Sequence, residues 1–515
     1  DKLFFYLGFD PQWQTVFRHA PAGYGQDLLG INPYEQESHF YSWSAKGTWV
    51  AHPNHTFEFS TFADPSNRSD GPNRNMLVQG DGNYSKLHFG SWNVTGRYNG
   101  VLTNNWFLTA SYSRAFNRFE EAFRYDLWQI ADYVQYFYQY YLPTHPGATP
   151  RNVASVATGG PGFFENNNGT NNQFNIKTTF NFSAGGEHTF DFGYAYEDVS
   201  YIAVRRYTGP MVDVPAYGGF SGASTFGGSF RRQWYRMADG SYWDRNGDGT
   251  LAVADALVWQ RRGNYNDPNI STSTNYHSFY LQDAWKISPQ VTFKAGIRYD
   301  YQKIAGGGPN STDFVFDGNW APRLGLIYDI KGDGKTKIYG SWGKFFQKIP
   351  QDLAVRALSV ETGITSAFWA DVSMTDFING EMVAAGVTPY PGQGNPLPLG
   401  RPGSTPTYVM PDTKAMYQNE FVLGFDHELS PTMSLGARYI WRTVGRNLAD
   451  VGSQTPEQWN TDEIGVYQYV ITNPSAGMDI FDNAAGVLGA DGIPDGLADM
   501  SRTYNAFELT LEKRF

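Results

Sequence analysis

The sequence predicts an all-β fold, a transmembrane antiparallel β-barrel of the outer-membrane type, and three observations support this class. Strand-like segments alternate apolar and polar residues, their connections alternate between short and long, and no run of roughly 18 apolar residues offers a membrane helix. The clearest segments are residues 174–182 and 190–196, which flank a tight turn at 184–187. In both arms, aromatic or other apolar residues alternate with mostly polar or small ones. Such two-faced strands suit a wall between lipid and a wet interior better than a dry protein core.

Composition agrees with a barrel wall. The chain is 17% aromatic and contains 56 glycines and no cysteine, yet its mean hydropathy is only −0.46. A barrel needs an apolar residue only at every second strand position, so its average hydropathy stays low. The absence of cysteine is compatible with passage through an oxidising periplasm. A net charge of −11 argues against a nucleic-acid partner, which would require a concentrated basic face.

The alternating pattern predicts a series of strands in chain order. We expect them near residues 2–17, 38–50, 55–63, 84–98, 105–116, 173–183, 188–205, 274–286, 291–303, 319–330, 336–347, 415–429, 432–446 and 503–515. Connections of a few residues alternate with longer ones, of which 117–172, 206–273, 348–414 and 447–502 are the longest. In an outer-membrane barrel the short turns are periplasmic and the long loops extracellular. We therefore predict that residues 1–515 form part of one barrel domain, with 206–273 as a long extracellular loop.

The two faces of the wall can be predicted from the same alternation. One continuous antiparallel sheet is expected, because a slip of one residue would move charged side chains into lipid. The residues expected to face lipid are Phe180, Phe192, Tyr194, Phe293 and Ile297. The residues expected to face the interior are Lys177, Asp191, Lys294 and Arg298.

Several strand–turn–strand motifs resemble a known family. Residues 280–300, with the sequence YLQDAWKISPQVTFKAGIRYD, are closely similar to a hairpin of TonB-dependent outer-membrane receptors. The segments 321–346, 419–425 and 504–515 agree, and together with the opening DKLFF they look most like the Oar-like branch. The order and spacing of these motifs are specific over residues 274–515, and the resemblance is looser over 1–273.

The resemblance implies more than the barrel wall. Such receptors have a barrel of 22 strands, a plug domain inside the lumen, and a periplasmic segment that contacts a TonB-type energy-coupling protein. Residues 1–515 contain about 14 predicted strands and neither a plug domain nor a signal peptide. We therefore expect only the barrel portion here, with a first and last strand that do not pair with each other. Residues 503–515 fit either an internal strand or a true terminal strand, and we favour the former.

One loop carries the pattern of a calcium site. Within residues 244–255, oxygen-bearing side chains stand at loop positions 1, 3, 5 and 12, with Gly249 at position 6, as in a loop that wraps a hard cation. The predicted ligands are Asp244, Asn246, Asp248, the carbonyl of Thr250 and Asp255. Aspartate at position 12 is similar to dockerin repeats, and residues 256–262 resemble a dockerin helix. We predict a structural calcium ion here; the alternative is an acidic, solvated turn.

Two other segments have an ordinary explanation that we favour. The tyrosine-rich stretch 133–141 lies in a segment, 120–142, that is predicted to be helical until Pro143. It suits either a stacking platform for a sugar or peptide or, as favoured here, packing between loops. Residues 491–499 are a weaker version of the calcium pattern, with Ile493 where an oxygen ligand is needed, and a plain loop is favoured.

The sequence favours a transporter or surface protein over an enzyme. It contains no Gly-x-Ser-x-Gly nucleophile motif, no phosphate-binding Gly-Lys-Ser/Thr motif and no paired catalytic residues. The first hypothesis is the barrel of a TonB-dependent receptor that takes up an extracellular ligand by energised plug displacement. The second is an outer-membrane adhesion or structural protein with calcium-stabilised loops. The expected partners are the lipid bilayer, an extracellular ligand and a TonB-type protein, with no nucleic acid.

Overall fold

A computed structural model gives the structure of most of the chain. It describes residues 2–18, 34–71, 77–78, 84–127, 129–134, 148–149, 154–209, 212–214, 223–234, 236–237, 248–249, 257–264, 269–306, 313–351, 353–355, 363–370, 408–452, 469–482 and 487–513. These residues are almost entirely β-strand. None of the helical structure among them is long and apolar enough to cross a membrane.

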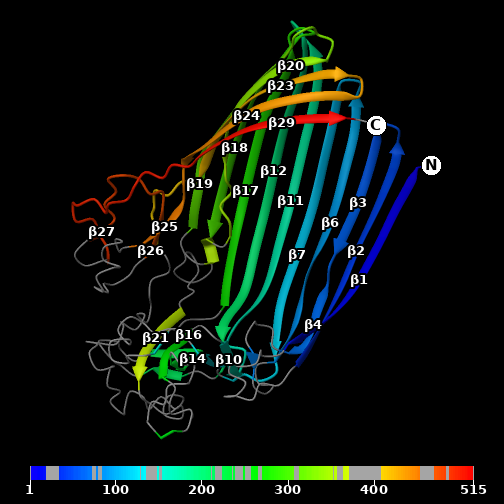
Figure 1. Ribbon diagram of the computed structural model, residues 1–515. Coiled ribbons are helices and arrows are strands. Elements are labelled where there is room, and N and C mark those ends of the chain that lie inside the picture. The colour runs from blue at the N-terminus through cyan, green and yellow to red at the C-terminus, as the bar shows by residue number, and fades with distance from the viewer. Residues whose placement is uncertain are drawn as a thin grey trace.

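A single antiparallel sheet forms a tall curved wall (Figure 1). In spatial order its strands are β1 (Leu3–Arg18), β2 (Tyr34–His52), β3 (His55–Ala63), β6 (Ser85–Thr103), β7 (Trp106–Phe123), β11 (Phe163–Ser183), β12 (Glu187–Tyr207), β17 (Asn269–Lys286), β18 (Val291–Ala305), β19 (Asp313–Asp329), β20 (Thr336–Phe346), β23 (Tyr417–Ser430), β24 (Met433–Arg446) and β29 (Thr503–Lys513). A short strand, β4 (Ser66–Gly71), pairs with β2 and β6. Every wall strand predicted from the alternating pattern is present, and spatial order follows chain order throughout.

The short turns gather at one end of the wall and the long connections at the other, as Figure 1 shows. Local chemistry explains the turn after β19. Gly332 and Gly334 adopt φ values of 71° and 77°, a left-handed conformation that glycine reaches without strain. Their backbone N–H groups donate to the Asp329 carboxylate at 2.9 and 2.6 Å. The turn therefore satisfies these two backbone donors from within its own residues.

The register separates the wall into an apolar face and a polar face. Asp191 on β12 lies opposite Gln282 on β17, and both stand on the polar face with Lys177 of β11. The alternate residues of these strands and of β18 point to the opposite, apolar face. On that face Phe192 and Ile297 are 42% and 43% exposed. All nine residues assigned to a face from the sequence lie on the predicted side. The apolar face is the lipid-facing surface of an outer-membrane barrel, and the polar face lines its lumen.

The wall is an open sheet within the described residues. β1 pairs only with β2, and β29 pairs only with β24, so these two strands do not pair with each other, as predicted. The apolar side chains of β1 are highly accessible, with Phe5 89% exposed. Fourteen strands follow one another along the path of the wall.

A second sheet is built from pieces of several long loops and lies beyond the loop end of the wall (Figure 1). Its strands are β21 (Gly363–Ala370), β16 (Leu257–Asn264), β14 (Ala223–Trp234), β8 (Gln129–Val134), β10 (Ala154–Gly159) and β5 (Leu77–Val78), with β13 (Val212–Val214) beside β14. Smaller pairings join β9 (Ala148–Thr149) to β15 (Arg236–Met237), β26 (Tyr469–Thr472) to β22 (Tyr408–Val409) and β25 (Ala449–Gly452), and β27 (Phe481–Asp482) to β28 (Val487–Leu488).

This loop sheet overturns two predicted helices. Within 120–142 the chain continues β7 to Phe123 and then forms β8, and within 256–262 it forms β16 from Leu257 onward. Both strands are paired on two sides: β8 with β10 and β14, and β16 with β14 and β21. Hydrogen bonds to distant segments therefore decide the conformation of both stretches over their local helix propensity. The prediction of a dockerin-like helix at residues 256–262 is therefore wrong.

Candidate functional site

The lumen face of the wall carries ion pairs between neighbouring strands along much of its width. They join Lys46 to Glu58 (3.4 Å), Lys177 to Asp191 (3.1 Å), Lys337 to Asp426 (3.1 Å), Arg438 to Glu508 (2.6 Å) and Arg442 to Glu420. Each pair places opposite charges on adjacent strands, so the surface is hydrophilic while its charges are locally balanced. Such a lining can pass a polar ligand without holding it at one strong charge.

Asp191 is a buried acid of this lining, with 6% of its surface exposed. Its carboxylate accepts hydrogen bonds from the Gln282 side-chain amide at 2.8 Å and from the Thr179 hydroxyl, and it contacts the Lys177 ammonium at 3.1 Å. A buried carboxylate is stable only when its oxygens have such partners. Asp191 therefore links three adjacent strands across the lumen face.

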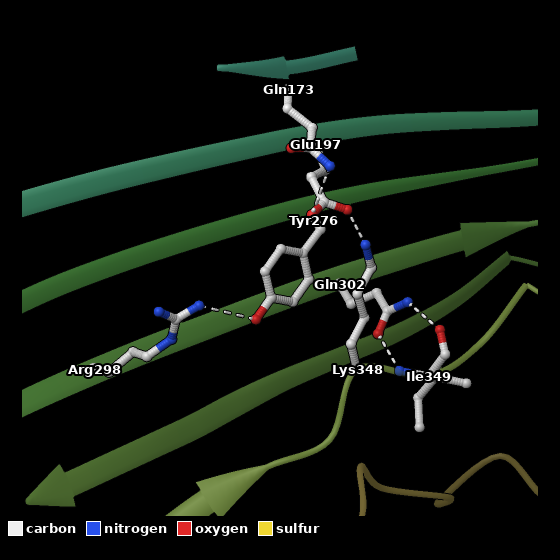
Figure 2. A network of polar contacts seen from close by, with 7 residues as sticks. All are labelled: Gln173, Glu197, Tyr276, Arg298, Gln302, Lys348 and Ile349. Atoms are coloured by element: carbon white, nitrogen blue, oxygen red, sulfur yellow. Dashed lines mark hydrogen bonds and ion pairs between the residues drawn. The ribbon is translucent and has the colours of Figure 1, made fainter. Parts of the chain in front are cut away.

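Nearer the loop end, a polar network occupies the same face (Figure 2). Arg298 donates through Nε to both oxygens of Asp300, at 2.9 and 3.1 Å, and through Nη2 to the Tyr276 hydroxyl at 3.4 Å. Asp300 is 6% exposed. The guanidinium thus binds two neighbouring groups and holds the Tyr276 ring in a fixed position on the wall.

The chain after β20 turns onto this network (Figure 2), and we call its described residues, 347–351 and 353–355, the strap. The Gln302 side chain holds the strap as a neighbouring strand would: its amide nitrogen donates to the Ile349 carbonyl at 2.8 Å, and its oxygen accepts from the Ile349 N–H at 2.9 Å. Gln302 and Ile349 are only 2% and 3% exposed. Figure 2 shows this two-pronged contact beside Lys348.

Two further contacts bind the strap to the wall. The Lys348 ammonium pairs with the Glu197 carboxylate and lies 5.2 Å from the centre of the Tyr276 ring. The Gln351 side chain donates to the Thr272 hydroxyl at 2.9 Å. Burial lowers the pKa of the Lys348 ammonium, so its charge in this place depends on the carboxylate that faces it. Strands β12, β17 and β18 therefore all hold one short segment.

An apolar cluster packs around the strap. It is formed by Ile304, Phe316, Ile349, Ala354, Val409, Ala415 and Ile471. Val355 packs separately against Ala203 and Ile270. These groups come from the loop ends of wall strands, the strap and two later loops. The strap is thus packed between the lumen wall and residues of later loops at the extracellular end.

The sequence-based search for sites did not find the strap. Residues 347–355 have neither strand alternation nor a motif, and they open one of the longest predicted connections. A signal was present only in Gln302, a polar residue at a lumen-facing position of β18. Nothing in the linear pattern indicates that its partner lies 47 residues further along the chain.

Most of the predicted calcium loop lies outside the described residues. Among its five predicted ligands, only Asp248 is described, and its side chain is exposed. Gly249 follows with a φ of 76°, the left-handed conformation expected at the sharp turn of such a loop. The calcium site stays a prediction.

The other two candidate segments can be placed in part. Of the tyrosine-rich stretch, residues 133–134 are described and belong to β8, whereas 135–141 lie outside the described residues. In 491–499, the carboxylates bind backbone amides: Asp495 accepts from the N–H of Ile480 at 2.7 Å, and Asp499 from that of Ala476 at 2.8 Å. Aspartates in this segment thus brace the loop through hydrogen bonds.

Comparison with known proteins places this architecture in a family. The sequence matches the family described as "Outer membrane beta barrel domain" over residues 9–318 and 303–515. The chain belongs to that outer-membrane β-barrel family. The apolar face of the barrel therefore contacts the outer membrane, and the long loops are extracellular.

A curated relative of this barrel is the TonB-dependent transporter Oar of Myxococcus xanthus. It is 27% identical over 358 residues, which cover 64% of the chain and 30% of the relative. This match confirms the predicted resemblance to the Oar-like branch. The chain thus spans less than a third of the length of that relative, and the relative is a transporter.

A solved structure shows the same fold. The outer-membrane transporter YddB of Escherichia coli superposes with a TM-score of 0.53 at 13% identity, covering 92% of this chain and 47% of that one. The ferripyoverdine receptor of Pseudomonas aeruginosa gives a TM-score of 0.49 at 10% identity and covers 100% of this chain and 53% of that one. The chain spans about half the length of these proteins.

Proposed function

We propose that this barrel belongs to a TonB-dependent receptor that takes up an extracellular ligand through the lumen after energised displacement of a plug. The tethered strap carries the proposal, because three wall strands hold it against the lumen face at the extracellular end, beside the route that a ligand would take. The ion-paired lumen face supports passage of a polar ligand. Similarity to the transporter Oar supports coupling to a TonB-type protein.

Cysteine labelling tests this proposal directly, because residues 1–515 contain no cysteine. In the full-length protein, with any cysteine elsewhere replaced by serine, Ser341→Cys places a thiol on the lumen face of β20. Intact cells are treated with a membrane-impermeant maleimide with and without an uncoupler of the proton gradient. If the protein takes up its ligand by energised plug displacement, labelling of Ser341→Cys should fall severalfold when the proton gradient collapses.

The control is Ala476→Cys, an exposed position in an extracellular loop. Its labelling should not depend on the proton gradient, because no plug or strap covers it. Equal labelling of Ser341→Cys in energised and uncoupled cells would contradict energised uptake.

A second candidate is a surface adhesion or structural protein with calcium-stabilised loops. The loop sheet favours it, because segments from several loops combine into one extracellular platform. We propose that residues 244–255 bind one calcium ion through Asp244, Asn246, Asp248, the Thr250 carbonyl and Asp255. The ion would stiffen a long loop and so lower the ordering cost of docking a partner. This candidate predicts lumen labelling that is independent of energy.

A further inference from the structure

Two cations lie together on the lipid-facing side of the wall, at its extracellular end. Both contact the ring of Tyr417 on β23: the Lys344 ammonium of β20 is 3.9 Å from the ring centre, and the Arg446 guanidinium carbon of β24 is 5.3 Å from it. Cations are attracted to the face of an aromatic ring. One tyrosine thus holds two positive charges from the strands on either side of it.

Strand alternation places Lys344 on the outer face. On β20, Lys337 reaches Asp426 across the lumen side, whereas Ile338 and Trp342 are 41% and 38% exposed on the lipid side. Lys344 lies two residues beyond Trp342 and therefore faces lipid as well.

A β-bulge turns Arg446 to the same side. Tyr417 pairs with Arg446, but Gln418 pairs with Val444, so Gly445 is left opposite no residue. In a regular strand Arg446 would share the lumen face with Arg442, and the extra residue re-aims it. A Cβ on Gly445 would overlap the Tyr417 ring. Glycine at this position therefore lets the ring lie against the strand between the two cations.

The two cations have no acidic partner within the described residues. No carboxylate there forms an ion pair with Lys344 or Arg446, and Arg446 donates instead to the Ala415 carbonyl at 2.9 Å. This contrasts with the lumen face, where several lysines and arginines pair with acids on adjacent strands. Two like charges held at one ring beside lipid are unfavourable unless an anion neutralises them.

The height of the cluster suits a lipid headgroup. β20 has 11 residues, and a membrane-spanning strand needs about 9–11. Lys344 lies close to the loop end of this strand, so it reaches the extracellular boundary of the hydrocarbon.

We propose that Lys344, Arg446 and Tyr417 bind the phosphate of an anionic lipid in the extracellular leaflet. The guanidinium and the ammonium donate to phosphate oxygens, and Tyr417 fixes both donors. The adjacent Trp342 contacts the acyl chains on the same face. This lipid site is separate from the lumen and does not depend on transport.

Native mass spectrometry of the full-length protein in detergent tests the site. Phosphatidylglycerol, which carries a phosphate anion, is titrated against zwitterionic phosphatidylcholine. Each cation near the membrane surface contributes roughly 1 kcal/mol toward an anionic lipid, so the Lys344→Gln/Arg446→Gln variant should bind the first phosphatidylglycerol about thirty-fold more weakly. The exchange variant Lys344→Arg/Arg446→Lys keeps both charges and should retain binding.

A control with the same change of charge is Arg97→Gln/Lys294→Gln, which alters two lumen-facing cations and should bind the lipid as the wild type does. Equal phosphatidylglycerol affinity of the wild type and Lys344→Gln/Arg446→Gln would overturn the proposal. Full displacement of the lipid by an equal concentration of inorganic phosphate would also overturn it, because the site would then select a free anion. Loss of binding in the exchange variant, with folding retained, would show that charge is not the cause.

Discussion

Replacing Gln302 with leucine is expected to release the strap from the lumen wall. Leucine has a similar volume and fits the apolar cluster around Ile304, but it cannot bond the Ile349 N–H or carbonyl. If the strap stayed in place, each of these buried groups would lose its partner at a cost of about 1–3 kcal/mol. Detachment lets water satisfy them, so we expect the strap to open rather than remain strained.

The expected increase in opening of the strap follows from the two lost hydrogen bonds, of 2.8 and 2.9 Å. A net contribution of about 1 kcal/mol for each hydrogen bond gives about 2 kcal/mol, which corresponds to roughly thirty-fold more frequent opening of the strap. Hydrogen–deuterium exchange of peptides covering residues 347–355, measured by mass spectrometry, reports this opening.

A matched control exists at the other end of the wall. Gln290 also donates its side-chain amide to a backbone carbonyl, that of Ile330 at 3.0 Å, but in an exposed turn. Gln290→Leu should leave exchange of the strap unchanged, because water replaces the lost contact and the site is distant. If Gln302→Leu exchanges in the strap at the wild-type rate, the reasoning about this tether is wrong.

Three further predictions concern the wall and the calcium loop. Asp191→Ala removes the acceptor shared by Lys177, Thr179 and Gln282 and should destabilise the barrel by about 1–3 kcal/mol, seen as a lower denaturant midpoint; an unchanged midpoint would contradict it. Phe192→Lys should cost about 2–4 kcal/mol in lipid, whereas Ser341→Lys at an exposed position on the lumen side should be tolerated, and equal losses would refute the face assignment. Asp248→Ala should make the loop sensitive to protease in calcium-containing buffer, and equal resistance of the wild type with and without chelator would exclude the ion.

The wall was predictable because its two solvents are different. Lipid on one side and water on the other impose a two-residue period, and this fixed each wall strand and the side of residues such as Lys177 and Ile297. The predicted strand bounds were least accurate beyond the edge of the membrane. β11 begins at Phe163 rather than near residue 173, because residues 165–172 are polar or glycine and carry no alternation.

The strap and the loop sheet were not predictable because their contacts are non-local. Gln302 and Ile349 meet only once β18 and β20 stand in register within the wall. Likewise, β8 and β16 have sequences that suit helices, and they become strands through pairing with segments about a hundred residues away or more. Local propensity contains no information about these partners.

The origin of the loop sheet has a consequence for the order of folding. Its strands lie between residues 77 and 370, and the pairing of β8 with β14 is parallel, so the entropy of closing the intervening chain opposes their meeting. Formation of the wall removes most of that cost, because it brings the loop ends to one rim. The extracellular sheet should therefore be the last region to gain structure during assembly and the first to lose it under mild denaturation.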